Sequence, residues 1–457
     1  MEPRFQSRRS DILPECRVPP AVFNGVTERL VEFAEPYAKR LLRPEQREHA
    51  RTYLQGILSD LQRKNTEAIA YRHDEDRQGL QIFIGQSPWD HHPLLEELAV
   101  QVAEELGEPD GILVFDPSAF AKKGTHSVGV ARQWCGRLGK KENCQVAVFL
   151  GYVSREEHTL VDMRLYLPEE WTKDRARCKA AGVPLGQRRF RTRHELALEM
   201  LDSKGPLLPH GWIAGDAEMG RPAWFRRKLN ERGECYLLAV PSNITIRDLE
   251  AEPPPYGGRG PRCKVPFVQV REWCDALPDD TWTMLEVRDG AKGPIEVQIA
   301  RRRVRAKIDK KVGPEETLVV IRGFDEMGQM KTDYCLSNAP PETPLAELAR
   351  VANAEHRIEE CIKRGKSEAG MAQYQARNWL GWHHHITLCL IAVWFLLLET
   401  RRGKKMDADV DGAAGSSVLR KDFARRFGMR HASADTPRKR AMAESQPTCR
   451  VGTSRIV

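Results

Sequence analysis

Two aspartates come directly after apolar runs that have the length and composition of buried strands. Asp116 ends the run in LVFDPSAF, and Asp216 ends the run in WIAGDAEMG. A carboxylate at the tip of a buried strand is rigidly held at the sheet edge, and two such tips can share a hard cation such as Mg²⁺. The other interpretation is that each aspartate caps the turn or helix that follows, as aspartate commonly does. The pair therefore indicates either a metal-dependent reaction or two local caps.

A third carboxylate is expected from the helical pattern at 344–366. Its apolar stripe consists of Leu348, Val351, Ala352, Ile358 and Ile362. At 100° per residue the centre of this stripe lies near Glu355, and Glu359 lies within about 50° of it. Lys366 follows Glu359 by two turns on nearly the same face, where it would set a cation beside a bound phosphate. Glu359 and Lys363 also form a common i,i+4 surface pair, and Glu355 remains a geometric competitor for the third acid.

The elements that position these acids change in character along the chain. Residues 1–108 have apolar positions at helical spacing and predict a helical N-terminal region. Residues 109–245 begin with about four short β runs, in which AKKGT and SREEH have the composition of hairpin loops. Strands and helices then alternate up to residue 240. Strands first antiparallel and then alternating with helices predict a mixed α/β sheet.

The second half of the chain contains three further segments. Residues 246–342 open with a Pro/Gly-rich linker and continue as alternating β runs, which predicts a β-rich insertion. Residues 343–400 contain two helical patterns, and the second includes the run ITLCLIAVWFLLL. This run has 13 residues, whereas a bilayer span needs about 20, so we expect a buried core helix and no membrane association. Residues 401–457 lose all periodicity and are expected to form a disordered basic tail.

The charge of the chain is concentrated in that tail. The 457 residues carry 72 Lys+Arg and 64 Asp+Glu, a net charge of +8. Residues 401–457 hold 14 Lys+Arg and 6 Asp+Glu, a surplus of 8 that accounts for the whole net charge. This balance excludes a histone-like protein. The N-terminus has no apolar segment typical of a secretory signal, so we expect a cytoplasmic protein.

Several motifs occur together in one order, and they resemble a known family. The segments are FDPSAFAKKGTHSVGVARQWCGRLGK, GWIAGDAEMGR, YLLAVPSN, HRIEECIKRGKSEAG and YQARNWLGWHHHITL. Over about residues 25–400 the chain resembles the DDE-type transposases of bacterial insertion sequences, in the DDE superfamily endonuclease group. The resemblance implies a ribonuclease H-like fold with a β-rich insertion between the second and third acids.

The resemblance also assigns the acids. Asp116 matches the first acid, Asp216 the second and Glu359 the third, and these would be both the catalytic residues and the metal ligands. The related Tyr-x2-Arg-x3-Glu-x6-Lys signature is only half present, because its Tyr position is Ala352 and its Arg position is Glu355. The implied cofactor is a pair of Mg²⁺ ions, for which Mn²⁺ can substitute. Two such ions would support in-line phosphoryl transfer.

DNA is the implied partner, as terminal inverted repeats and target DNA held by a synaptic homodimer. Basic residues near the acids are candidates for DNA contact, and so are basic residues on one face of a strand in the insertion. They are Lys122, Lys123, His126, Arg301, Arg303, Arg305 and Lys366. The alternative is that the first group is an ordinary solvated hairpin and the second is the solvent face of a β ribbon.

Two other functions remain open on the sequence alone. One is a ribonuclease H-like nuclease that cleaves DNA without joining strands. The other is a catalytically silent DNA-binding protein derived from a transposase, which the departures at Ala352 and Glu355 leave open. The consecutive His383, His384 and His385 fan out by 100° each on a helix and cannot share one ion, so we expect them at a helix surface or near DNA.

Overall fold

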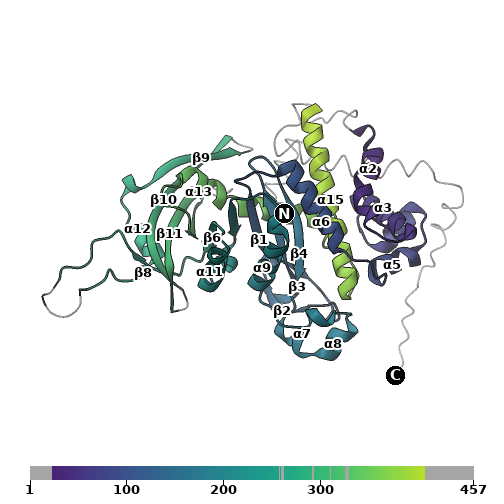
Figure 1. Cartoon of the computed structure of the whole chain (residues 1–457), viewed down its shortest axis with the longest axis horizontal. Helices are drawn as coiled ribbons and strands as arrows, with labels where there is room; N and C mark the ends of the chain where they lie inside the picture. The colour runs from purple at the N-terminus through teal and green to yellow at the C-terminus, as the bar shows by residue number, and fades with distance from the viewer. Residues whose placement is uncertain are drawn as a thin grey trace, which may run out of the picture.

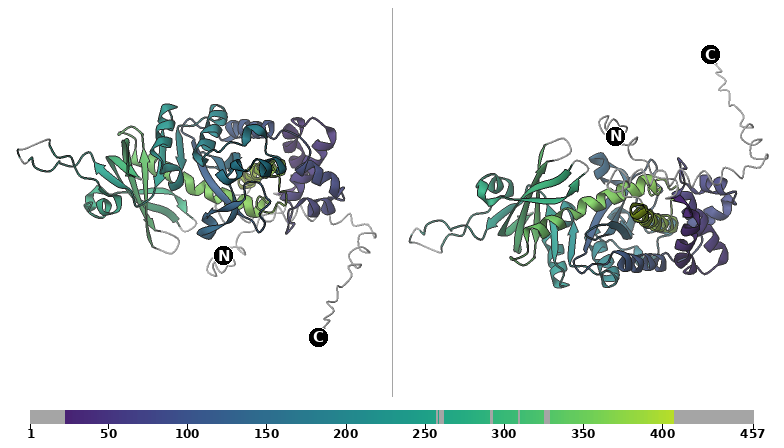
Figure 2. Two further views of the ribbon diagram at one scale, coloured as in Figure 1. Left: turned by 90° about the horizontal axis from the view of Figure 1, so that it is seen from below. Right: turned by 90° about the horizontal axis from the view of Figure 1, so that it is seen from above.

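The computed structural model describes residues 23–406, except 257, 259–261, 291–292, 309 and 325–328. The described part is elongated, with the insertion at one end, the N-terminal helices at the other and the core sheet between them (Figures 1 and 2). Most apolar side chains of the N-terminal helices and the core sheet belong to one continuous hydrophobic core, and the insertion has a second, smaller core of its own.

The N-terminal region is helical, as its periodicity predicts. Its helices are α2 (Val26–Lys39), α3 (Pro44–Leu58), α4 (Thr66–His73), α5 (Arg77–Gly85) and α6 (His92–Leu106). Local capping sets some of the boundaries: the Asn65 side chain accepts the Ala68 N–H at the start of α4, and the Asp76 side chain accepts two N–H groups at the start of α5. These helices form a unit that packs beside the core sheet rather than within it (Figure 1).

Helix α15 (Trp379–Met406) joins the core sheet to the N-terminal helices. It runs between the core sheet and the N-terminal helices, and it contacts α3, α5, α6 and β4 (Figure 1). By length and composition alone, Trp379–Lys404 could cross a membrane, but 83% of its apolar window is buried in the protein. The prediction of a buried core helix is therefore confirmed. The helix also continues through Met406, into the segment expected to be a tail, and residues 407–457 lie outside the described residues.

The three consecutive histidines of α15 are buried, so the expectation of a surface position was wrong. Burial lowers the pKa of His383 to about 3 and the pKa values of His384 and His385 to about 4. His383 Nδ1 lies 2.8 Å from the Trp379 carbonyl oxygen of its own helix, whereas His384 and His385 have partners on other segments. His385 Nδ1 lies 2.8 Å from the Tyr53 hydroxyl and its Nε2 lies 3.2 Å from the Gly370 carbonyl oxygen. A neutral ring satisfies both by accepting from Tyr53 and donating to Gly370.

We expect His385→Gln to weaken the acid sensitivity of the fold. In the unfolded chain His385 gains a proton near pH 6.5, whereas in the folded chain it stays neutral until about pH 4. Its contribution is therefore full above pH 6.5 and is lost as pH falls, at about 1.4 kcal/mol per pH unit. Between pH 6.5 and 5 the variant should lose about 2 kcal/mol less unfolding free energy than the wild type.

Urea unfolding of both proteins at pH 6.5 and pH 5 measures this difference. Because other groups also titrate in this window, the comparison is between the two proteins and not between two pH values alone. An equal loss of stability in the wild type and the variant would show that His385 titrates normally in the fold.

The described strands form one 12-stranded sheet in which the core occupies one half. The core strands are β1 (Ile112–Ala121), β2 (Ala131–Cys135), β3 (Lys140–Val153), β4 (His158–Leu165), β5 (Trp212–Gly215) and β6 (Tyr236–Val240). β3 pairs antiparallel with β1, β2 and β4, while β5 pairs parallel with both β1 and β6. The helices that connect these strands are α7 (Glu169–Lys173), α8 (Arg175–Ala180), α9 (Arg193–Lys204), α10 (Ala217–Gly220) and α11 (Ala223–Glu231). The expected mixed α/β sheet is thus present.

One of the two expected hairpins is not formed. SREEH joins β3 to β4, which are antiparallel neighbours, so that loop is a hairpin. AKKGT follows β1, but β1 pairs with β3 and β5, and β2 pairs with the far side of β3. The physical reason is the length of β3, whose 14 residues reach past the end of β1 and provide the partner for β2. Residues 122–130 form the loop between β1 and β2.

The insertion is mostly β, as expected, and its strands extend the core sheet. Its elements are β7 (Thr245–Asp248), β8 (Val268–Gln269), α12 (Val270–Asp275), β9 (Thr283–Gly290), β10 (Gly293–Ile308), β11 (Lys311–Phe324) and β12 (Met330–Ser337). β12 pairs antiparallel with β6, and Val240 lies opposite Tyr334. The chain therefore leaves the core sheet and returns to it through neighbouring strands.

A buried ion pair fastens the insertion to the core. Arg226 on α11 and Glu316 on β11 have fully buried side chains, and two guanidinium nitrogens donate to the two carboxylate oxygens at 2.6 and 3.1 Å. The Tyr236 hydroxyl donates to the same carboxylate at 2.7 Å, and Arg226 also donates to the carbonyl oxygen of Gly220. Every charge of the pair thus has a hydrogen-bond partner, which a buried charge requires.

Candidate active site

Parallel pairing of β1 and β5 brings the two predicted aspartates together. The pairing runs from Ile112 opposite Trp212 to Phe115 opposite Gly215, so Asp116 and Asp216 follow the last pair side by side. After this point β5 ends, whereas β1 continues along β3 as far as Ala121. Asp216 also caps the following helix, since its Oδ1 accepts the Met219 N–H at 2.9 Å. The capping interpretation of Asp216 is confirmed, while its second carboxylate oxygen leaves the metal-binding interpretation as a prediction.

A glycine allows the glutamate-bearing helix to approach the same place. The expected single helix at 344–366 is in fact two, α13 (Leu345–Ala352) and α14 (Ala354–Glu368), which meet at Asn353. Ile358 of α14 packs over Gly151 of β3, where an added Cβ would lie 2.4 Å from the Ile358 side chain. Gly151 pairs with Val114, two residues before Asp116 on β1. This contact sets α14 over β1 with its glutamates near the paired aspartates.

The two candidate glutamates lie one helical turn apart on the same flank of α14. The buried stripe of this helix consists of Ala354, Ile358, Cys361, Ile362 and Gly365. Glu355 lies closer to that stripe and is half-buried, whereas Glu359 is exposed. Both remain candidates for the third acid.

The carboxylates influence one another electrostatically. Burial and then repulsion from Asp216, Glu355 and Glu359 raise the pKa of Asp116 well above its usual range. Burial raises the pKa of Asp216 to about 6, against the opposing effect of its N-cap hydrogen bond. Burial and repulsion from Asp216 and Glu359 raise the pKa of Glu355 to about 7. The site therefore concentrates more negative charge than its surroundings neutralise.

Lys366 lies beside this cluster, as its spacing from Glu359 predicts. Its Nζ donates to the Ser118 hydroxyl at 2.7 Å and to the Ala119 carbonyl oxygen at 3.1 Å. Ser118 is two residues from Asp116 on β1, so the two side chains project from the same face of the strand. The ammonium lowers the pKa of Asp116, although burial and repulsion outweigh it. Lys366 can thus offer a positive charge to a phosphate bound at the acids.

The donor set suits a hard divalent cation. All the clustered groups are carboxylates, and oxygen donors are what Mg²⁺ and Mn²⁺ prefer. Their raised pKa values follow from burial and crowding of like charge, and a bound cation would relieve both effects. Asp116, Asp216 and one of the two glutamates are the residues that would hold it.

A cavity of about 230 Å³ adjoins the acids on the side of the insertion. Its walls come from β5, β6, β10, β11, β12, α13 and α14, and its polar lining includes Lys331, Asp333, Glu355 and His356. Lys331 Nζ lies 3.1 Å from Asp333 Oδ1. The sequence contains no signal for this contribution, because Lys331 and Asp333 reach the acids only through the pairing of β12 with the core sheet.

The basic residues predicted near the acids lie at different distances from them. Lys122 follows the end of β1, about 20 Å along an extended strand from Asp116. Its ammonium stacks 3.4 Å from the centre of the Tyr374 ring. Lys123 and His126 are exposed in the loop that follows. Of these four basic residues, Lys366 hydrogen-bonds to the acid-bearing strand beside Asp116, and DNA contact by all four stays a prediction.

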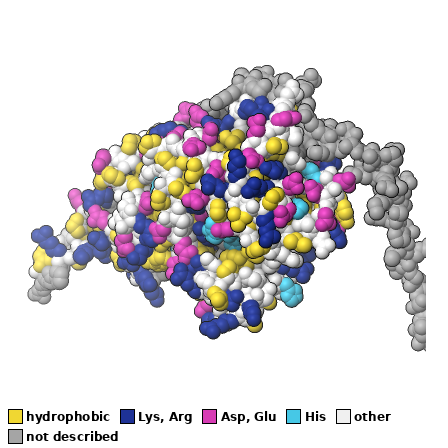
Figure 3. All heavy atoms as spheres, turned by 45° about the vertical axis from the view of Figure 1, so that its right-hand side comes forward, with side chains coloured by type: hydrophobic (Ala, Val, Ile, Leu, Met, Phe, Trp, Pro, Cys, Tyr) yellow, Lys and Arg dark blue, Asp and Glu magenta, His cyan; other side chains and the backbone are white. Residues whose placement is uncertain are grey.

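The basic stripe of the insertion lies on one face of β10, as alternation predicts. Arg301, Arg303 and Arg305 are all exposed. Arg301 donates to the Thr343 carbonyl oxygen, and Arg303 and Arg305 form ion pairs with Glu315 on the neighbouring strand. On the face drawn in Figure 3, Lys and Arg are interspersed with Asp and Glu. DNA contact by this stripe also stays a prediction.

Comparison with known proteins places this arrangement in a family. The model of the DDE superfamily endonuclease family matches residues 36–294, more than half of the chain. A curated relative, the probable transposase for insertion sequence element IS701 from Microchaete diplosiphon, is 27% identical over 332 residues, which cover 71% of this chain and 75% of that protein. A cryo-EM structure of the piggyBac transposase synaptic complex with hairpin DNA is 11% identical, with a TM-score of 0.38, over 90% of this chain and 78% of that one. On the family match, the chain belongs to the DDE superfamily endonucleases.

Proposed function

We propose that this protein is the DNA transposase of an insertion sequence, which cleaves the ends of its element and joins them to target DNA. The observation that carries the proposal is the placement of Asp116 and Asp216 side by side where the parallel pairing of β1 with β5 ends, beneath the glutamates of α14. Membership of an endonuclease family supports it, and so does the similarity to a probable insertion-sequence transposase.

The order of the core strands supports a ribonuclease H-like fold for the catalytic core. The strands lie in the order β4, β3, β1, β5, β6, of which the first three are antiparallel and the last three parallel. The acids then lie where β1 and β5 diverge, at the carboxyl end of the parallel strands. Such ends are where ligands bind in open α/β sheets.

The proposed chemistry is phosphoryl transfer. When bound, two Mg²⁺ ions would activate water or a DNA 3′-hydroxyl and stabilise the leaving oxygen. Asp116, Asp216 and Glu359 would hold them, since backbone pairing and the close packing of α14 on β3 fix the carboxylates in place before DNA arrives. Lys366 would contact the phosphate from the same face of β1.

Incubation of the full chain with DNA that carries the terminal inverted repeats flanking its gene tests the proposal. With Mg²⁺ we expect nicks or breaks at the repeat ends, followed by joined products when a second DNA is added. Cleavage without joined products would identify a nuclease. Binding without cleavage under either Mg²⁺ or Mn²⁺ would identify a silent DNA-binding protein.

The two glutamates of α14 can be separated by their effects on that reaction. We expect Glu359→Gln to abolish cleavage, because a metal ligand is lost, and Glu355→Gln to lower it by less than about tenfold. Glu355 would then tune the site through its repulsion of Asp216. Rates of end cleavage at saturating Mg²⁺ measure both. The reverse order of effects would assign the third metal ligand to Glu355.

A further inference from the structure

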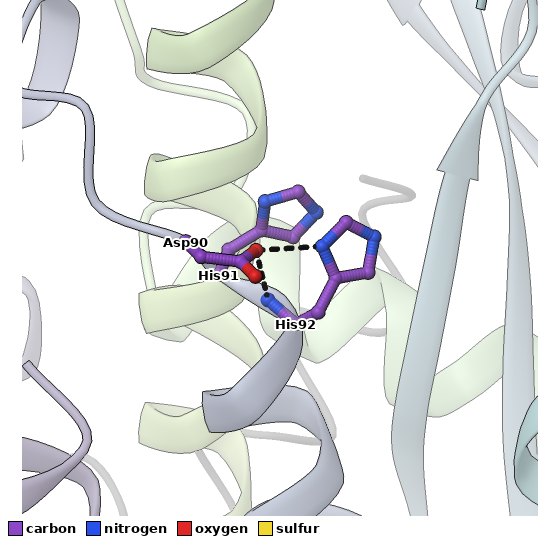
Figure 4. Close-up of side chains that lie close together, drawn as sticks. All are labelled: Asp90, His91 and His92. Carbon is purple, nitrogen blue, oxygen red and sulfur yellow. Dashed lines mark hydrogen bonds and ion pairs between the residues drawn. The ribbon is translucent and has the colours of Figure 1, made fainter. Parts of the chain in front are cut away.

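A second group of metal-binding side chains lies at the start of α6, in the N-terminal helical unit. Asp90, His91 and His92 project their ligand atoms toward a common point, and these atoms lie within 4.8 Å of one another (Figure 4). Two of the groups are already paired: Asp90 Oδ1 lies 2.7 Å from His92 Nδ1 and accepts the His92 backbone N–H at 3.0 Å. Asp90 and His92 have side chains that are 64% and 59% exposed, so an ion can reach them from solvent.

The environment of His91 is not explained by its place at the start of a helix. The residue is only 8% exposed, yet its ring nitrogens make no hydrogen bond or ion pair with any residue in the described part of the chain. The ring lies between two other imidazoles, with centroids 4.1 Å from His92 and 4.8 Å from His383. A ring nitrogen that makes no bond to the protein can bind a metal ion, and neutral imidazole is a common metal ligand.

We propose that Asp90, His91 and His92 form a zinc site, in which water takes the fourth position. Mixed imidazole and carboxylate donors select a borderline ion such as Zn²⁺, whereas the all-carboxylate active site selects Mg²⁺ or Mn²⁺. Tetrahedral bonds of about 2.0–2.1 Å place ligand atoms roughly 3.3 Å apart. Asp90 Oδ1 and His92 Nδ1 lie 2.7 Å apart, and all three ligand atoms lie within 4.8 Å of one another, so small side-chain movements would bring them to this spacing.

The site would fasten the entry to α6 against the central helix α15. His91 contacts His383 of α15, and the adjoining Trp89 ring stacks on His384 with centroids 3.6 Å apart. Zinc bound here stabilises the junction between the N-terminal helical unit and the core. The inference does not depend on the proposed function, because none of its ligands belongs to the active site.

Zinc titration of the full chain, stripped with a chelator and carrying Asp216→Asn to weaken binding at the active site, tests the proposal. We expect one Zn²⁺ per chain in competition with a chromophoric chelator, a rise in melting temperature on zinc addition, and the visible absorption of tetrahedral Co²⁺ when cobalt replaces zinc. His92→Ala should weaken binding about 10–100-fold and remove the rise in melting temperature.

Two further variants keep the test specific. Asp90→Ser removes the carboxylate but retains a side chain that can cap α6, so it should lose zinc without loss of fold. His126→Ala removes an exposed histidine elsewhere and should bind zinc like its parent. A parent protein that binds no zinc, or a His92→Ala variant that binds it as tightly as the parent, overturns the proposal.

Discussion

Asp216→Asn is expected to reduce Mg²⁺-dependent cleavage of the element ends by at least about 10³-fold, while DNA binding stays within a few-fold of the wild type. Loss of a metal-binding carboxylate removes several kcal/mol of transition-state stabilisation, and about 4 kcal/mol corresponds to 10³-fold in rate. The fold should survive, since an asparagine oxygen can still accept the Met219 N–H that begins α10. Single-turnover cleavage and an equilibrium DNA-binding assay measure the two effects separately.

A matched acid outside the site provides the control for this experiment. Asp202 lies on the surface, where it pairs with Arg232, and Asp202→Asn should leave the cleavage rate within about twofold. Asp116→Asn should reproduce the effect of Asp216→Asn, because the two carboxylates follow one pair of residues on adjacent strands. Cleavage by Asp216→Asn within tenfold of the wild-type rate would remove this residue from the metal site.

Arg226→Met is expected to destabilise the protein by about 3–5 kcal/mol, the largest stability effect of a single substitution that we predict. It leaves Glu316 buried, with the Tyr236 hydroxyl in place of a full counter-charge. It also removes the donor to the Gly220 carbonyl oxygen, at the end of the short helix that Asp216 caps. We therefore expect weaker cleavage as well as a lower urea midpoint.

The double variant Arg226→Met with Glu316→Gln separates the lost attraction from the cost of an unpaired charge. It should recover most of the lost stability, because no uncompensated charge remains in the core. Arg232 directly follows α11, the helix that carries Arg226. Arg232→Met breaks the exposed pair with Asp202 and should lower the free energy of unfolding by less than about 1 kcal/mol. A cost for Arg226→Met as small as that would show that the buried pair contributes no more than a surface pair.

The aspartates could be predicted from sequence because the relevant pattern is local. An apolar run followed at once by Asp predicts a carboxylate at a strand end, which is correct for Asp216, whereas β1 continues past Asp116 to Ala121. Parallel pairing of β1 with β5 then brings the two aspartates together. The identity of the third acid could not be predicted in the same way, because the helix is interrupted at Asn353. Angles counted at 100° per residue along one continuous helix do not include that break. The central position of Glu355 in the assumed stripe followed from that assumption, and the structure leaves it half-buried on a flank.

Features that depend on distant partners were missed or predicted wrongly. His383, His384 and His385 are buried because the N-terminal helices pack against α15. Two of the contacts come from Ile84 and Tyr53, some 300 residues earlier in the chain. The absent hairpin after β1 has the same kind of cause. Its loop residues are typical of a turn, but the length of a later strand, β3, decided which strands became neighbours.

The pairing of β6 with β12 has a consequence for how the protein can diverge. Because Val240 lies opposite Tyr334, the insertion begins and ends at one point of the core sheet, and a short turn could replace it without moving β1 or β5. Closing a longer loop at that point adds little entropic cost, so its length is free to drift between lineages. One position is coupled to that length: a homologue that has lost β11 has also lost Glu316, so its Arg226 needs either a new partner or exposure to water.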